Sequence, residues 1–418
     1  MSKLLIEGGR SLSGLVEVGG NKNAALPLLA ACLLTDEECV LDNVPRIGDV
    51  EVMARLLTDL GGEVEGLGTT RLRVRCRELV GEEPDRAMVG RLRGSVLLMG
   101  PLLARRGRAR LAPPGGDFPA RRTISIHLEA LGAMGARERE GPGHELEAPD
   151  GLRAASFYLE EASVTGTETA ILAAAAARGT TEIRHAACEP HVVELCQFLR
   201  AMGAEISGEG TSTVRIVGGQ RLRGAAHRLD GDYIEAGSWA VVAAITRGEI
   251  EIRGARTEHI EVVSSALSRM GVRCTVEEGI FRVERSLPTS ARRITTGVWP
   301  AFPSDLVSLL TVLATQAEGR TLVHDWMYEL RLFALEQLSG MGADLFLCDP
   351  HRIIVTGPTR LRGKALDSRD LRSGMALIAA ALAADGASSV EPLETVERGY
   401  ARLVETLTRL GGHVERIG

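Results

Sequence analysis

Residues 192–208 read VVELCQFLRAMGAEISG and contain two kinds of local structure. The first ten residues place apolar side chains three and four positions apart, which is typical of an amphipathic helix. The Met-Gly-Ala that follows is typical of a helix C-cap, where glycine takes the left-handed conformation and the chain turns. The alternating residues after the glycine indicate a strand. The stretch therefore predicts a helix, a tight turn and a strand in direct succession.

The same Leu/Met-Gly signature recurs along the whole chain, each time after an amphipathic stretch and before a predicted strand. Its glycines are Gly61, Gly135, Gly203, Gly271, Gly342 and Gly411. Consecutive copies lie 68 to 74 residues apart. This period is longer than the roughly 20–50 residues of most solenoid repeats. It predicts six copies of one larger unit, each about 70 residues long.

Two further patterns complete the repeated unit. A helix rich in small apolar residues precedes each signature, as in ETAILAAAAARGT at residues 168–180. Because such helices are apolar nearly all round, we expect them to be buried. An apolar-x-Gly-x-x-x-Leu-x-Gly pattern at residues 6–14, 216–224 and 355–363 predicts a strand, a turn and a strand. We therefore expect an α/β protein with two domains of three repeats, in which helices lie inside and sheets outside.

Composition excludes several classes of function. The 418 residues suffice for two or three domains. A net charge of −6 and an aromatic content of 3% argue against a nucleic-acid partner. No signal peptide or bilayer-spanning stretch is recognisable, so no membrane partner is expected. Seven cysteines without a Cys-x-x-Cys pair indicate reduced thiols and a cytoplasmic location.

Common cofactor and metal motifs are also missing from the sequence. No Gly-x-Gly-x-x-Gly follows a predicted strand, and residues 19–23 lack the Lys-Ser/Thr pair of a P-loop. The nine histidines include no His-x-x-x-His pair, and no Cys/His cluster has the spacing of a zinc site. We therefore predict no cofactor and no metal.

Charged residues stand where the buried helices are predicted to begin, among them Lys22, Arg93, Asp305 and Arg372. Capping or a surface ion pair explains any one of them. A cation at a helix start opposes the helix dipole, however, and favours a bound anion. Several cations at equivalent points of two similar domains would suit a small anion such as a carboxylate-phosphate.

Residues 113–127, PPGGDFPARRTISIH, form a loop, because their prolines and glycines exclude a helix or strand. The loop carries Asp117, Arg121 and Arg122. A charged surface turn is the simplest interpretation of such a segment. A loop that brings an acid and a guanidinium to a bound anion is the alternative.

The sequence resembles the enolpyruvyl transferases over essentially its whole length, closest to the UDP-N-acetylglucosamine 1-carboxyvinyltransferases. The motifs that match, in the family's order, are VGGNKNAALPLLAACLLT, PGGD, EPHVVEL, YIEAGSW, FPSDL, DLRSG and ERGYARL. The resemblance implies two inside-out α/β barrel domains. One covers residues 22–229 and carries a lid, the other combines residues 1–21 with 230–418, and the active site lies in the cleft between them.

The resemblance also implies a reaction and its residues. The enolpyruvyl (1-carboxyvinyl) group of phosphoenolpyruvate, the co-substrate, is transferred to a sugar hydroxyl of a uridine nucleotide, and phosphate is released. The catalytic residues carried over are Lys22, Asp117, Asp305 and Arg398. The phosphoenolpyruvate-binding residues are Lys22, Arg93, Arg122, Arg331, Arg372 and Arg398. The nucleotide-binding residues are Asn23, Arg121, Thr123, Ser125, Ser163, Val164, Thr165, Glu189, Asp232 and Asp305.

The chemistry explains why these residue types are needed. By the resemblance, Asp305 is expected to deprotonate the acceptor hydroxyl, Asp117 to protonate the methylene carbon, and the cations to hold the carboxylate and phosphate. The loop at residues 113–127 matches the family's mobile lid, which excludes water when it closes. Either Arg121 or Arg122 is the lid arginine.

The acceptor side departs from the family pattern. Thr123 replaces a proline of the lid, Ser125 replaces an aspartate that helps to read uridine, and Glu161 adds a negative charge beside the SVTGTE motif. Asp117 in place of the usual lid cysteine is a known kind of variation and should preserve acid catalysis. The acceptor-side changes favour a paralogue from nucleoside-antibiotic biosynthesis that acts on the ribose 3′-hydroxyl of UMP. UDP-N-acetylglucosamine, in peptidoglycan synthesis, is the alternative acceptor.

A different class of function stays open as well. An inactive binding paralogue is the remote alternative, and the retention of all four predicted catalytic residues argues against it. Shikimate 3-phosphate is disfavoured as acceptor, because the matched motifs are those of the uridine branch. The oligomeric state is left open.

Overall fold

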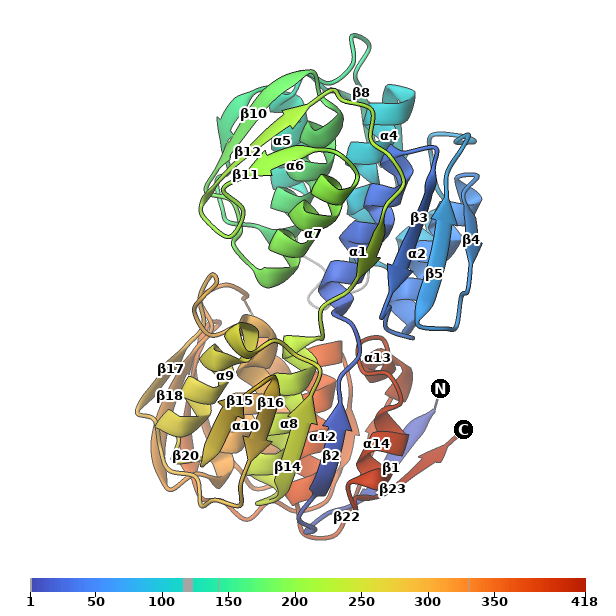
Figure 1. Cartoon of the computed structure of the whole chain (residues 1–418). Helices are drawn as coiled ribbons and strands as arrows, with labels where there is room; N and C mark the ends of the chain where they lie inside the picture. Colours follow the sequence, from blue (N-terminus) through green and yellow to red (C-terminus); the bar gives the residue numbers. More distant parts are fainter. Residues whose placement is uncertain (1, 116–122, 142, 330) are drawn as a thin grey trace. The chain divides into compact units, whose positions relative to one another are not determined.

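The computed structural model describes residues 2–115, 123–141, 143–329 and 331–418 (Figure 1). The chain divides into two compact units. The central unit is Gly20–Asp230, and the terminal unit combines Met1–Gly19 with Gly231–Gly418. At the ends of the central unit, the Asn21 backbone N–H donates to the Asp230 carbonyl at 2.8 Å.

The central unit contains three sheets among its described residues, one for each predicted repeat. In spatial order, the first sheet is β13 (Ala226–Arg228), β3 (Glu38–Asp42), β5 (Arg71–Arg75) and β4 (Glu63–Glu65). The second is β6 (Arg108–Leu111), β8 (His144–Glu147) and β7 (Arg137–Arg139). The third is β11 (Glu205–Ser207), β12 (Thr213–Gly218), β10 (Gly179–Arg184) and β9 (Ser156–Tyr158).

The helices of the central unit fall into a buried set and an amphipathic set. The buried set is α1 (Lys22–Ala31) with η1 (Cys32–Leu34), η2 (Arg93–Leu98) with α4 (Met99–Arg106), and α6 (Val164–Ala176). The other helices are α2 (Gly48–Asp59), the short α3 (Arg86–Val89), α5 (Ser125–Ala133) and α7 (Pro190–Ala201).

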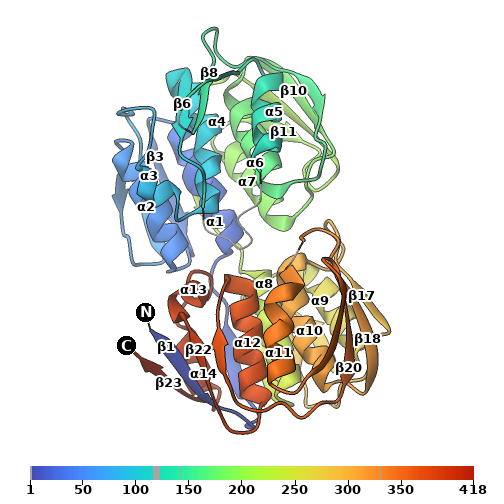
Figure 2. The same cartoon turned by 180° about the vertical axis from the view of Figure 1, so that it is seen from behind.

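The terminal unit repeats this plan with three sheets in its described part. They are β21 (Ala365–Asp367), β22 (Ala387–Glu391), β1 (Lys3–Glu7) and β23 (His413–Ile417); β15 (Cys274–Glu277), β16 (Ile280–Val283), β14 (Glu249–Arg253) and β2 (Ser13–Glu17); and β17 (Arg293–Thr295), β18 (Gly319–His324), β20 (Arg352–Gly357) and β19 (Asp344–Asp349). The two chain ends meet here, because β1 and β23 pair antiparallel (Figure 2).

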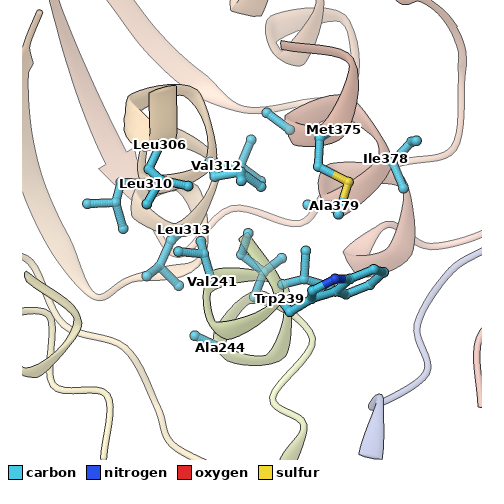
Figure 3. Packing of buried hydrophobic residues seen from close by; sticks show 14 of the residues in the cluster. Trp239, Val241, Ala244, Leu306, Leu310, Val312, Leu313, Met375, Ile378 and Ala379 are labelled. Carbon is cyan, nitrogen blue, oxygen red and sulfur yellow. The ribbon is translucent and has the colours of Figure 1, made fainter. Parts of the chain in front are cut away.

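Three buried helices form the core of the terminal unit. They are α8 (Tyr233–Ile245), α10 (Val307–Gln316), which η3 (Ser304–Leu306) precedes, and α12 (Leu371–Ala383). Figure 3 shows side chains of the three helices packed in one cluster, among them Trp239 of α8, Val312 of α10 and Met375 of α12. The outer helices are α9 (Thr257–Arg269), η4 (Arg331–Glu336) with α11 (Gln337–Gly340), and α13 (Leu393–Glu397) with α14 (Leu403–Arg409).

The predicted α/β architecture with buried helices and six repeats is confirmed. All six signature glycines have φ between +71° and +107°, as a left-handed C-cap requires. The first glycine of each strand–turn–strand pattern is needed because a side chain would not fit there. A Cβ at Gly8, Gly218 or Gly357 would come within 2.0 to 2.5 Å of an alanine carbonyl oxygen at the end of a buried helix. In the described part of the chain, none of the helices is long and apolar enough to cross a membrane.

Candidate functional site

The terminal unit places two predicted arginines against one predicted carboxylate. Arg331 Nη1 lies 3.2 Å from Asp305 Oδ1, and Arg372 Nη2 lies 2.7 Å from Asp305 Oδ2. Asp305 lies in η3, Arg331 begins η4, and Arg372 lies in the first turn of α12. We call these three residues the Asp305 cluster. The Asp305 carboxylate is thus shared by two guanidiniums, one at each oxygen.

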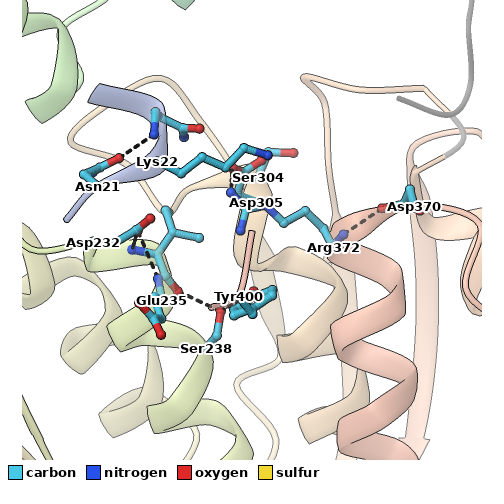
Figure 4. Close-up of polar contacts among 12 residues, drawn as sticks. Asn21, Lys22, Asp232, Glu235, Ser238, Ser304, Asp305, Asp370, Arg372 and Tyr400 are labelled. Atoms are coloured by element: carbon cyan, nitrogen blue, oxygen red, sulfur yellow. Dashed lines mark hydrogen bonds and ion pairs between the residues drawn. The ribbon is translucent and has the colours of Figure 1, made fainter. Parts of the chain in front are cut away.

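Arg372 is held by buried groups around it. Tyr400 donates to Ser238 Oγ at 2.7 Å, and Ser238 in turn donates to a backbone carbonyl of α8 (Figure 4). Burial by itself would lower the pKa of Arg372, but the Asp305 carboxylate and a hydrogen bond with Tyr400 raise that pKa above its ordinary value. Burial also raises the pKa of the Tyr400 hydroxyl. Arg372 is therefore a permanent cation beside Asp305.

Arg331 is held from two sides. Its guanidinium carbon lies 4.2 Å from the centre of the Tyr328 ring, within the range of a cation–π contact. Its Nη1 also donates to Ser304 Oγ at 2.8 Å. The Arg331 side chain is 15% exposed and that of Asp305 is 26% exposed. The carboxylate is thus the more accessible of the two groups.

Two other predicted residues of the terminal unit lie at helix ends. Asp232 caps α8, because its Oδ1 accepts from the backbone N–H groups of Ile234 and Glu235 at 2.8 and 3.1 Å. Burial and the neighbouring Asp232 raise the pKa of Glu235 to about 8. Arg398 is the C-cap residue of α13 and is half-buried.

In the central unit, Lys22 forms a buried ion pair. Its Nζ lies 2.8 Å from Asp49 Oδ2, with side chains 12% and 5% exposed. Asp49 lies in the first turn of α2, where the helix dipole favours a carboxylate. The position of Lys22 and Arg372 at helix starts therefore does not by itself require a bound anion, and their predicted binding of phosphoenolpyruvate stays a prediction. Carboxylates of the protein itself already face both.

The start of α5 gathers three predicted residues. Arg93 Nη2 donates to the Thr123 carbonyl at 2.6 Å, and the hydroxyls of Thr123 and Ser125 are 2.9 Å apart. Both hydroxyl residues are exposed. Asp117, Arg121 and Arg122 lie outside the described residues, so their predicted roles stay predictions.

The remaining predicted residues lie at the starts of α1, α6 and α7. Ser163 caps α6 by accepting from the Gly166 N–H at 3.3 Å, and Val164 and Thr165 form the first turn. Thr165 Oγ1 also lies 3.2 Å from His127 Nε2. Asn23 lies in the first turn of α1, and its N–H donates to the capping side chain of Asn21 at 2.8 Å. Glu189 occupies the N-cap position of α7 and is 8% exposed.

Comparison with known proteins identifies the family. The sequence profile of EPSP synthase (3-phosphoshikimate 1-carboxyvinyltransferase) matches residues 6–407. The chain belongs to this enolpyruvyl transferase family. It is an enzyme that transfers an enolpyruvyl group, as predicted.

Individual relatives of this enolpyruvyl transferase refine the comparison. The UDP-N-acetylglucosamine 1-carboxyvinyltransferase of Bradyrhizobium diazoefficiens is 41% identical over 99% of this chain and 97% of its own length. The Borreliella burgdorferi protein of the same name is 39% identical over 100% of this chain and 99% of its own length. The crystal structure of the enolpyruvyl transferase NikO from Streptomyces tendae superposes with a TM-score of 0.89 at 26% identity. That superposition covers 99% of this chain and 98% of NikO.

The structure of this enolpyruvyl transferase also shows residues that sequence patterns missed. Ser304 lies in the FPSDL motif and Tyr400 in the ERGYARL motif, so the matched motifs already indicated that these segments belong to the site. Asp49 and Asp325 lie in no recognised motif, and a lone aspartate is ordinarily a surface residue.

Among the described residues, no group of three or more His, Cys, Asp or Glu side chains could hold a metal ion.

Proposed function

We propose that this enolpyruvyl transferase uses UDP-N-acetylglucosamine as its acceptor. The observation that carries the proposal is the identity of 41% and 39%, over essentially the whole chain, to relatives named for that substrate. The identity to NikO is 26%. The comparisons therefore favour the alternative acceptor of the sequence analysis over UMP.

The sequence departures that favoured UMP as acceptor carry less weight once the residues involved are placed in the structure. Much of the altered lid, including Asp117, lies outside the described residues. Glu161 is exposed, where water screens its charge. Its carboxylate would therefore repel a diphosphate only weakly. The exposed hydroxyls of Thr123 and Ser125 can still accept or donate hydrogen bonds to a nucleotide.

The proposed chemistry assigns one task to each group. Asp305 takes the proton of the sugar hydroxyl while the oxygen attacks the central carbon of phosphoenolpyruvate, and Asp117 protonates the methylene carbon. Loss of phosphate from this tetrahedral adduct and of a proton from its new methyl group leaves the enol ether. Lys22, Arg93, Arg122, Arg331, Arg372 and Arg398 bind the carboxylate and phosphate of phosphoenolpyruvate. The fixed guanidiniums of Arg331 and Arg372 support this assignment, because cations that are held in place stabilise an anion without reorganisation.

The test is phosphate release from phosphoenolpyruvate with UDP-N-acetylglucosamine and UMP in parallel, with mass spectrometry of the products. We expect UDP-N-acetylglucosamine to gain the enolpyruvyl group and UMP to be turned over at least tenfold more slowly, a difference of about 1.4 kcal/mol. Faster turnover of UMP would reverse the proposal. Phosphate release with neither acceptor would favour an inactive paralogue.

UMP remains the second candidate because Ser125 stands where the family's uridine-reading aspartate is expected. NikO, an enolpyruvyl transferase, superposes over 99% of this chain with a TM-score of 0.89. Fold similarity of this degree does not specify the acceptor. The same parallel assay decides between the two.

A further inference from the structure

A buried carboxylate lies behind the Asp305 cluster. Asp325 directly follows β18 and is 0% exposed. Its Oδ2 accepts from Ser304 Oγ at 2.7 Å, and its Oδ1 accepts from Thr296 Oγ1 at 2.6 Å and from the Met327 N–H at 3.3 Å. The Asp325 backbone N–H donates to the His351 carbonyl at 2.9 Å, and the Asp325 carbonyl accepts from His351 Nδ1 at 2.7 Å. The position and direction of this carboxylate are therefore fixed.

The Ser304 hydroxyl connects Asp325 to the cluster. A serine hydroxyl has one proton to donate. Because Asp325 accepts that proton, the Ser304 oxygen is left to accept from Arg331 Nη1 at 2.8 Å. The same Arg331 nitrogen lies 3.2 Å from Asp305 Oδ1. Asp325 thus determines which way the Ser304 dipole points, and this dipole holds the arginine.

Charges on several elements act on the cluster. Asp305, Asp325 and Asp370 attract Arg331, and Asp305 and Asp232 attract Arg372. Arg331 and Arg372 in turn flank Asp305. Asp325 is linked to Arg331 through the Ser304 hydroxyl. It therefore attracts the guanidinium and also orients the hydrogen bond that the guanidinium makes.

We propose that Asp325 is a positioning residue for the transfer reaction, which orients Ser304 so that Arg331 is held against Asp305. The inference rests on the proposed role of Asp305 as the base for the acceptor hydroxyl. When the hydroxyl is removed, Arg331 keeps its charge and its stacking on Tyr328. It loses the acceptor that fixes its nitrogen beside the carboxylate.

The experiment compares two variants that each remove one hydrogen bond from Asp325. Ser304→Ala breaks the link to Arg331, whereas Thr296→Val leaves that link intact. We expect Ser304→Ala to lower kcat by about 10- to 100-fold, since small misplacements of reacting groups have effects of this size. The KM for the uridine nucleotide should change less than threefold. Ser304→Thr keeps the hydroxyl and should restore turnover. Thr296→Val leaves the Met327 and His351 bonds to Asp325 in place, and should lower the melting temperature while lowering kcat far less than Ser304→Ala does.

The pH profile of kcat and a double variant provide two further readouts. A change in protein stability alone would not produce the results expected for either. In Ser304→Ala the acidic limb of the kcat profile should move to higher pH, because a carboxylate with a weakened guanidinium contact is protonated more readily. In an Arg331→Ala background, Ser304→Ala should have no further effect on kcat, because Ser304 acts through Arg331.

Two outcomes overturn the positioning role. They are equal kcat values for Ser304→Ala and Thr296→Val, or an undiminished effect of Ser304→Ala without Arg331. Asp305→Asn separates this failure from a failure of the proposed mechanism. If Asp305→Asn is inactive while Ser304→Ala is normal, only the positioning role is wrong. Normal turnover of Asp305→Asn would remove the base itself.

Discussion

Three cationic side chains with little exposure face carboxylates. Lys22 faces Asp49 in the central unit, and Arg331 and Arg372 face Asp305 in the terminal unit. Removal of one partner leaves the other charge buried, which costs more than the pair itself contributes. A loss of activity in such a variant therefore needs a stability measurement beside it.

The first prediction separates two roles of Lys22. Lys22→Ala should weaken phosphoenolpyruvate binding about 10- to 150-fold and lower the free energy of unfolding by about 1–3 kcal/mol. Lys22→Ala combined with Asp49→Ala should recover part of the stability, because no buried carboxylate is left unpaired. Isothermal titration and urea unfolding of both variants measure the two effects. Recovery of phosphoenolpyruvate binding in the double variant would assign Lys22 to stability alone.

The second prediction concerns Glu235, whose pKa is raised from the ordinary 4.5 to about 8, first by burial and then by Asp232. The folded protein holds this proton to higher pH than the unfolded chain. The resulting stability is therefore fully present below pH 4.5 and is lost as the pH rises toward 8. Glu235→Gln, which resembles the protonated acid, should remove a slope of up to about 1.4 kcal/mol per pH unit between these values.

Urea unfolding of wild type and Glu235→Gln from pH 5 to pH 8 tests this expectation. The difference in stability between the two proteins should change steadily with pH. A difference that stays constant over that range would show that Glu235 does not titrate there.

At the scale of elements, four buried helices begin with side-chain caps, whereas η2 and η3 have none. Asn21, Ser163, Asp232 and Asp370 accept hydrogen bonds from the first N–H groups of α1, α6, α8 and α12. These helices are apolar nearly all round, so their polar ends are where functional side chains can be placed. Caps and predicted site residues therefore share the same short stretches of sequence.

The third prediction tests the C-cap glycines on one helix. Gly135 ends α5 with φ at +95°, whereas Gly132 lies inside α5, and a Cβ at either position would meet no atom within 4 Å. Gly135→Ala should destabilise the protein by about 1–2 kcal/mol through backbone strain. Gly132→Ala should stabilise it by about 0.5–1 kcal/mol through helix propensity. Thermal unfolding compares the two, and equal effects would refute the left-handed cap.

At the scale of the whole molecule, each unit has its own three sheets, within the described residues, and its own buried helices. Within each unit, the residues at which the chain enters and leaves are joined by a backbone hydrogen bond. Asn21 donates to the Asp230 carbonyl and Asp232 donates to the Gly19 carbonyl, each at 2.8 Å. Each unit is therefore closed by a backbone hydrogen bond between its own residues.

The fourth prediction follows from this arrangement. Residues 20–230 expressed alone should fold, because the core and the closing hydrogen bond lie within them. Residues 1–19 joined to 231–418 through two glycines are the matched second fragment. Circular dichroism and cooperative thermal unfolding measure the outcome. Unfolded spectra for both fragments would show that neither core is sufficient.

Most of the fold could be read from the sequence because its signals are local. A helical spacing, a capping glycine and a strand lie within about 15 residues of one another, and the signature recurs six times. The motifs also indicated which residues belong to the family's site, and Asp305, Arg331 and Arg372 do lie together. Most of the assigned roles stay predictions, among them those of the lid.

Only the tertiary structure decided which charges face each other. Asp305 lies 26 residues from Arg331 and 67 residues from Arg372 along the chain, so no local pattern determines their contact. Asp49 and Asp325 were missed for the same reason. An aspartate in the sequence looks like a surface charge, and only the packing of separate elements around it decides that it is buried, paired and oriented.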